Sequence, residues 1–155
     1  YSQSLAEDLG QQCLSLMESA WYESIFPQTK ISGHTFAKGD FKTSKNGRRL
    51  ATSIDGTLTG SGADYIIIDD PLKPGEMYSA DKVEKVNKWY RNTLVSRLDQ
   101  PKEGRIVTVM QRIHENDLTG YLLNTSEDWK LISMPAIATK KEKWTYYGLG
   151  NIKKK

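Results

Sequence analysis

The chain has 155 residues, a formal net charge of +3 and 37% hydrophobic residues. This is the length of one ordinary domain with its own core, and the composition is that of a soluble globular protein. No apolar run approaches the ~20 residues needed to cross a bilayer, so we expect no membrane span. Six lysines follow Thr139 against one glutamate, so the rest of the chain is nearly neutral and its charge gives no argument for DNA binding. The single cysteine, Cys13, excludes an internal disulfide and is typical of a reducing compartment.

A helix is predicted near the start of the chain. Small or apolar side chains recur there at helical spacing: Leu5, Leu9, Cys13, Leu16 or Met17, and Ala20. Ser4 and Glu7 have the spacing of a capping box, and Pro27 sets the latest end of the helix. We expect the stripe, Cys13 included, to face the core.

A β-hairpin is predicted next. Residues 41–44 and 48–53 have strand-like composition, and Asn46-Gly47 between them is a strong signal for a tight turn. A loop rich in glycine and threonine follows over residues 55–64, where glycines allow positive φ or close approach of the backbone.

The apolar run of residues 65–68 stops abruptly at Asp69, Asp70 and Pro71. Its composition predicts a strand buried on both faces of a parallel sheet, ended by the proline. Ligands bind beyond the carboxyl ends of such strands. A strand ending in an acid is the Walker B arrangement, in which one carboxylate (Asp69) holds Mg²⁺, usually through water, and a neighbour (Asp70) orients or deprotonates the attacking water. Two aspartates before a proline are also common turn formers, and this alternative stays open.

The rest of the chain predicts a helix, a strand and a further helix. Ser79 is the predicted N-cap of the first helix. Its apolar stripe comprises Val83, Val86, Tyr90, Leu94 and Leu98, with lysines on the solvated side. A core strand is predicted over residues 106–110 and a short helix over about 115–123. The order of elements indicates an α/β fold with a mostly parallel sheet.

Several motifs in this order resemble one protein family. They are the Gly-rich stretch 56–64 leading into Ile68-Asp69-Asp70-Pro71, then Trp89-Tyr90, Ser96-Arg97-Leu98, the octapeptide 111–118, and Met134-Pro135-Ala136. Together they resemble the large subunit of tailed-phage and prophage terminases, the ATP-driven motors that package DNA. The likeness covers nearly everything from Tyr1 to Ala138.

The resemblance implies a P-loop NTPase-like fold, in which a mostly parallel sheet is flanked by helices, carries a β-hairpin insertion and is truncated at the N-terminus. Residues 1–139 would be a partial ATPase domain, and residues 140–155 a lysine-rich tail of unassigned role. Asp69 would hold Mg²⁺ through water, Asp70 would be the catalytic carboxylate, and Arg112 would couple hydrolysis to movement. A plain surface arginine remains the alternative for Arg112, and a metal site at His114, Glu115 and Asp117 ranks behind helix capping.

The implied cofactors are Mg²⁺ and ATP. The implied partners are double-stranded viral DNA, the portal protein and the small terminase subunit, in the cytoplasm of a bacterial host and without a membrane. Removal of a first parallel strand would leave an open sheet edge, so a homo-oligomer is a further expectation.

The phosphate-binding loop G-x-x-x-x-G-K-[ST] does not occur in the 155 residues, nor does the RNase H-like nuclease domain of the family. The loop of residues 56–62 lacks the lysine and precedes a strand instead of a helix. Without amides and a lysine around the phosphates, we expect these residues alone to hydrolyse ATP negligibly. The alternative is a non-catalytic prophage remnant or interaction module that keeps the fold, with Arg48, Arg49 and the lysine tail as its DNA contacts.

Overall fold

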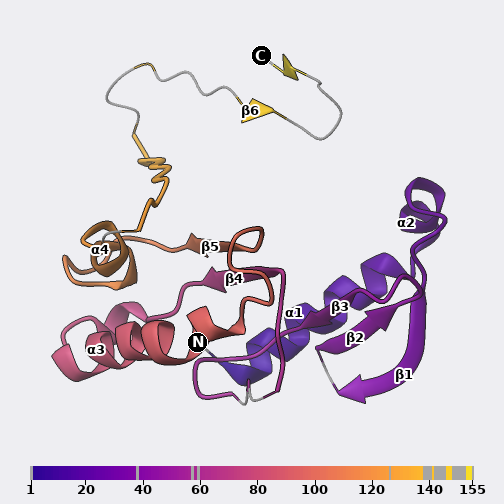
Figure 1. Ribbon diagram of the computed structural model, residues 1–155, viewed down its shortest axis with the longest axis horizontal. Coiled ribbons are helices and arrows are strands. Elements are labelled where there is room, and N and C mark those ends of the chain that lie inside the picture. The colour runs from indigo at the N-terminus through magenta and orange to yellow at the C-terminus, as the bar shows by residue number, and fades with distance from the viewer. Residues whose placement is uncertain are drawn as a thin grey trace.

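The computed structural model of the chain describes residues 2–37, 39–56, 58, 60–125, 127–137, 141, 146–147 and 153–154, with the backbone only at 33–37, 146–147 and 153–154. Within this part the protein is mixed α/β, as predicted (Figure 1). Its sheets are an antiparallel sheet β1-β2-β3, a parallel pair β4-β5 and an antiparallel pair β6-β7. The parallel sheet of the described residues thus has two strands, fewer than the mostly parallel sheet that the sequence predicts.

The predicted first helix is two helices in the structure, α1 (Gln3–Met17) and α2 (Ala20–Ile25). The N-cap of α1 is Ser2, whose hydroxyl accepts the Leu5 N–H at 3.4 Å. The predicted cap at Ser4 is therefore wrong, because Ser4 already lies inside the first turn. A short break separates the two helices, and α2 ends within the predicted limit.

The face that α1 turns toward the protein differs from the predicted one. Three leucines of the expected stripe are 43–51% exposed: Leu5, Leu9 and Leu16. The buried residue of α1 is Gly10, and a Cβ built there would lie 2.5 Å from the Cα of Gly39. This close approach of two backbones, which only glycine permits, decides which face packs, so the leucines face away and Cys13 is only partly buried.

The predicted hairpin is confirmed. Strands β2 (Asp40–Thr43) and β3 (Arg48–Leu50) pair antiparallel, and Asn46 in their turn has a φ of 62°. An additional strand that the sequence pattern did not indicate, β1 (Ile31–Ala37), pairs with β2 and completes the sheet.

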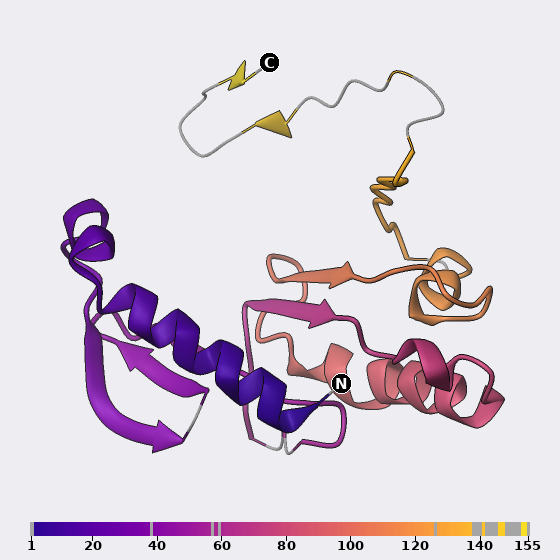
Figure 2. The same ribbon diagram turned by 180° about the vertical axis from the view of Figure 1, so that it is seen from behind.

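The parallel strands β4 (Tyr65–Asp69) and β5 (Arg105–Val109) lie side by side and are paired along their full length, with Tyr65 opposite Arg105 and Asp69 opposite Val109. The connection between them contains η1 (Pro74–Glu76), α3 (Ala80–Trp89), the π-helical turn η2 (Tyr90–Leu94) and the 3₁₀ turn η3 (Val95–Arg97). As predicted, Ser79 caps α3, because its hydroxyl accepts the Lys82 N–H at 3.4 Å. The result is one β-α-β unit, seen from both sides in Figures 1 and 2.

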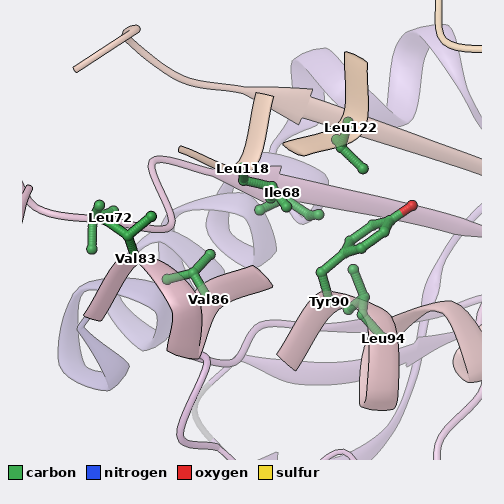
Figure 3. Close-up of a cluster of buried hydrophobic side chains, with 8 residues drawn as sticks. All are labelled: Ile68, Leu72, Val83, Val86, Tyr90, Leu94, Leu118 and Leu122. Carbon is green, nitrogen blue, oxygen red and sulfur yellow. The ribbon is translucent and has the colours of Figure 1, made fainter. Parts of the chain in front are cut away.

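The main core lies between the β4-β5 pair, α3 with its extension, and α4 (Leu118–Leu123) (Figure 3). Its buried members are Ile68, Leu72, Val83, Val86, Tyr90, Leu94, Leu118 and Leu122. The predicted apolar stripe of the helix is thereby confirmed for four of its five positions, and Leu98 is only partly buried.

Within the described residues the β4-β5 pair is covered on one face only, so the prediction of a strand buried on both faces is wrong. Ile68 is 5% exposed, whereas its neighbour Ile67 is 71% exposed. Side chains alternate between the two faces of a strand, and in the described residues only the face toward α3 is covered.

The short pair β6 (Tyr146–Tyr147) and β7 (Lys153–Lys154) falls in the predicted lysine-rich tail. In Figures 1 and 2 it lies away from the rest of the protein. Among the described helices, none combines the length and the hydropathy that crossing a membrane would require.

Candidate functional site

The carboxyl ends of β4 and β5 lie at the same edge of the parallel pair. Strand β4 ends at Asp69 opposite Val109, and the Asp70 N–H donates to the Val109 carbonyl at 3.0 Å. Residues 111–114 follow directly after this point. The structure therefore brings the two sequence-predicted sites, the aspartate pair and the Arg112 segment, to one edge of one sheet.

The backbone turns sharply at the aspartate pair. Asp70 has a φ of +39°, in the left-handed region that non-glycine residues seldom adopt, although aspartate tolerates it better than most. The next residues, Pro71 and Leu72, are both buried and hold the turn in place. A constrained backbone at a position of this kind is a common property of functional turns.

The carboxylates of Asp69 and Asp70 are both exposed. Within the part of the chain that the structure describes, neither carboxylate has a hydrogen bond or an ion pair. Two uncommitted carboxylates beyond a parallel strand fit a Mg²⁺ ion, which commonly takes one or two protein carboxylates and keeps several waters.

Arg112 lies in the loop after β5 and is held by a buried carboxylate. Its Nε donates to Asp117, at 3.0 and 3.1 Å from the two carboxylate oxygens. Its Nη2 lies 3.3 Å from the Glu115 carbonyl and 3.5 Å from the His114 carbonyl. The side chain of Arg112 is still 48% exposed, so it is an anchored arginine at the protein surface.

Asp117 organises this loop. It is 1% exposed and caps α4 by accepting the Gly120 N–H at 2.9 Å. Its other oxygen accepts the N–H groups of Ile113 and His114, at 3.2 and 3.3 Å. Helix capping in this segment was predicted and Asp117 provides it, whereas the pairing of Asp117 with Arg112 was missed, because only the loop conformation brings these two side chains together.

A further contact missed from the sequence supports the same loop from α3. Asn87 is 5% exposed and its Nδ2 donates to the Asn116 carbonyl at 3.1 Å. A polar residue beside the apolar stripe of a helix is the signal that could have pointed to it. Together with Asp117, it fixes the segment after β5 against the helix layer.

The alternative metal site at His114, Glu115 and Asp117 has no support in the geometry. The Asp117 carboxylate is fully used by Arg112 and by backbone N–H groups, and the His114 Nδ1 accepts the Asn116 N–H at 3.0 Å. Among the described residues, no group of three or more His, Cys, Asp or Glu side chains could hold a metal ion.

A hollow of about 290 Å³ adjoins the aspartate turn on the side of α3. It is lined by Ile54, Asp55, Pro71, Leu72, Lys73, Glu76, Lys82, Lys85 and Val86. Lys82 pairs with Glu76 at 2.7 Å and Lys85 with Asp55 at 2.6 Å. The hydrogen bond from Lys82 lowers the pKa of Glu76. Each pair connects α3 to a loop or to η1, so both lysines already have a carboxylate partner.

The arginines proposed as DNA contacts are engaged within the antiparallel sheet. Arg48 makes two bonds of 2.7 Å to the Asp40 carboxylate. The guanidinium of Arg49 lies 6.0 Å from the ring centre of Phe41. Arg48 is paired with a carboxylate, and the Nη1 of Arg49 is buried without a hydrogen-bond partner among the described residues, so neither guanidinium is directed to solvent as a whole. Most of the lysine tail lies outside the described residues, so the structure adds no support for a DNA-binding module.

The Arg48 to Asp40 pair gives a pH-dependent prediction. The hydrogen bond from Arg48 lowers the pKa of Asp40 below its ordinary 3.8, so the pair stabilises the fold above that value and loses this contribution as the pH falls through the folded-state pKa. Arg48→Gln is expected to lower the free energy of unfolding by up to about 1 kcal/mol at neutral pH, and by less than that at pH below the folded-state pKa. Urea unfolding over a pH series measures this. Arg91→Gln, an exposed arginine bonded only to Asn92 in the described part, is the control, and a pH-independent difference would contradict the role of the pair.

No match to this chain is found among protein-family models, among curated proteins or among solved structures. The geometry of the sheet edge and the order of the motifs are therefore what support a function.

Proposed function

We propose that this chain is part of the ATPase motor of a terminase large subunit, which packages double-stranded viral DNA. The observation that carries the proposal is the pair of exposed carboxylates of Asp69 and Asp70, which have no partner among the described residues and lie at the carboxyl end of a parallel strand, with the anchored Arg112 at the same edge. The β4-α3-β5 unit supports a P-loop NTPase-like fold, in which ligands bind beyond the carboxyl ends of the strands.

Each side chain has a distinct role in this proposal. Asp69, the last residue of β4, would hold Mg²⁺ through water, and the ion would supply positive charge against the phosphates. Asp70 orients or deprotonates the attacking water. The constrained backbone turn at Asp70 fixes the direction in which this side chain leaves the backbone. Arg112 presents a partly exposed guanidinium whose position depends on Asp117, which suits a residue that couples the nucleotide state to movement of a loop.

The wider assignment follows from the motif resemblance. The proposed cofactors are Mg²⁺ and ATP. The proposed partners are double-stranded DNA, a portal protein and a small terminase subunit, in a bacterial cytoplasm. The competing function is a non-catalytic module that keeps the fold, and the experiments below separate the two.

The coding sequence upstream of Tyr1 gives the first test. The motor predicts an in-frame strand followed by a lysine-bearing phosphate-binding loop, because Asp69 and Asp70 supply only the metal and water side of the site. A start codon next to Tyr1 would contradict the motor as a description of this polypeptide and favour the non-catalytic module.

Isothermal titration calorimetry of the 155 residues gives the second test. We expect MgATP affinity no tighter than millimolar, about 4 kcal/mol, because backbone amides and a lysine around the phosphates supply most of the binding in such sites. Micromolar binding would contradict the expected need for a phosphate-binding loop, and micromolar binding that survives Asp69→Asn would place the nucleotide elsewhere on the chain and overturn the role of Asp69.

A further inference from the structure

The face of the parallel pair that points away from α3 is apolar and open. Tyr65 and Ile67 of β4 are 75% and 71% exposed, and Val107 and Val109 of β5 are 48% and 55% exposed. We refer to these four side chains as the open face. Parallel sheets are normally covered on both faces, and contiguous exposed apolar side chains of this kind mark interaction sites.

The two ends of the open face carry opposite charges. Arg105 lies beside Tyr65 at the start of the strands, and Asp69 lies beside Val109 at their end. Both charged residues share the open face, because they occupy the same alternate positions as the apolar side chains. The three bonds of Arg105 within the described residues all leave from Nη1 toward carbonyls of the preceding turn, so Nε and Nη2 have no such partner.

We propose that a second copy of this chain covers the open face, with the two sheets packed face to face and their strands antiparallel. The two-fold axis then lies between the two sheets, perpendicular to the strands and at the level of Ile67 and Val107. It places this apolar pair opposite the same pair of the second copy, at the centre of the interface. It also brings the Arg105 end of each copy to the Asp69 end of the other. A parallel arrangement would place like ends together, so the charges favour the antiparallel one.

Among the described residues, no other segment covers the open face. In Figures 1 and 2 the stretch of residues 127–137 after α4 leads away from the sheet, and Met134 and Ile137 in that stretch are 85% and 81% exposed. Helix α1 is committed through Gly10 to the loop at Gly39. Because the open face is positive at one end and negative at the other, it is complementary to the same face of a second copy in the antiparallel orientation.

Sedimentation equilibrium of the 155-residue chain over a wide concentration range tests the proposal. We expect a monomer–dimer equilibrium that Ile67→Glu weakens by about tenfold or more, since it buries an unpaired charge at the centre of the interface. Tyr78→Glu is the matched control, because Tyr78 is 85% exposed but lies outside the open face, and it should leave the dimer unchanged. A wild-type chain that is monomeric at every concentration overturns the proposal.

A charge exchange tests the orientation of the two copies. Asp69→Arg and Arg105→Asp are each expected to weaken the dimer, and the double variant to recover most of the loss, with circular dichroism melts showing that each variant is folded. A dimer whose affinity is unchanged by Ile67→Glu but lost in Met134→Glu would show that the segment after α4 forms the interface. That result would overturn the proposal. The inference does not rest on the proposed function: in the dimer the Asp69 carboxylate pairs with Arg105 of the second copy, so dimer formation and Mg²⁺ binding at Asp69 would compete.

Discussion

Replacement of Asp70 by asparagine is expected to lower ATP turnover by about 100-fold or more, the usual contribution of a positioned acid or base. The expectation applies to the complete polypeptide in which a phosphate-binding loop accompanies these residues. Asparagine tolerates the positive φ found at this position, so the turn and the hydrogen bond to Val109 should persist while the carboxylate is lost. Steady-state phosphate release measures the turnover, and calorimetry should show unchanged MgATP affinity.

Two neighbouring acids serve as comparisons for this variant. Asp69→Asn should act mainly through Mg²⁺, raising the concentration of the ion needed for half-maximal turnover. Asp81→Asn, at an exposed acid in the first turn of α3, should leave turnover unchanged. Full turnover in Asp70→Asn would remove Asp70 from the catalytic role, and loss in Asp81→Asn would show that the assay reports folding instead of chemistry.

Asp117→Ala is expected to lower the free energy of unfolding by about 3 kcal/mol. The variant removes the cap of α4, leaves three backbone N–H groups without their acceptor and takes away the partner of Arg112. For a chain of this length such a loss corresponds to a fall in Tm of roughly 6–12 °C. Thermal and urea unfolding followed by circular dichroism measure it.

Asp117→Asn separates the two contributions. Asparagine is a good N-cap but carries no charge, so it should recover most of the helix-capping part and lose the pairing with Arg112. Asp128→Ala, at an exposed acid without a bond in the described part of the chain, is the control and should shift stability by less than about 0.5 kcal/mol. Equal stability of Asp117→Ala and the wild type would contradict the organising role of Asp117.

Local chemistry explains the predictions that the structure confirms. The Asn46 turn and the Ser79 cap depend on neighbouring backbone groups, so short segments are sufficient to predict them. The stripe that includes Val86 and Tyr90 was predicted for a similar reason, because helical spacing puts those side chains on one face.

Apart from the cap at Ser4, the failed predictions concern which surfaces pack against each other. The leucine stripe of α1 had the right spacing for a core face, but the close approach of Gly10 to Gly39 turned another face inward. Strand β4 had the composition of a strand buried on both faces, yet Ile67 remains exposed. An apolar composition makes burial of a strand favourable on both faces. Whether each face is buried depends on which elements of the fold cover it.

The sequence by itself determined the mixed α/β class, the two parallel strands, and an aspartate pair at the end of one of them. Only the tertiary structure decided that the Arg112 loop lies at the same edge, that Asp117 holds it there, and that one face of the parallel pair stays open. The physical reason is that strand and turn propensities act between neighbours in the chain. Strand register, an ion pair in a loop and the cover of a sheet face depend on residues that only the fold brings together.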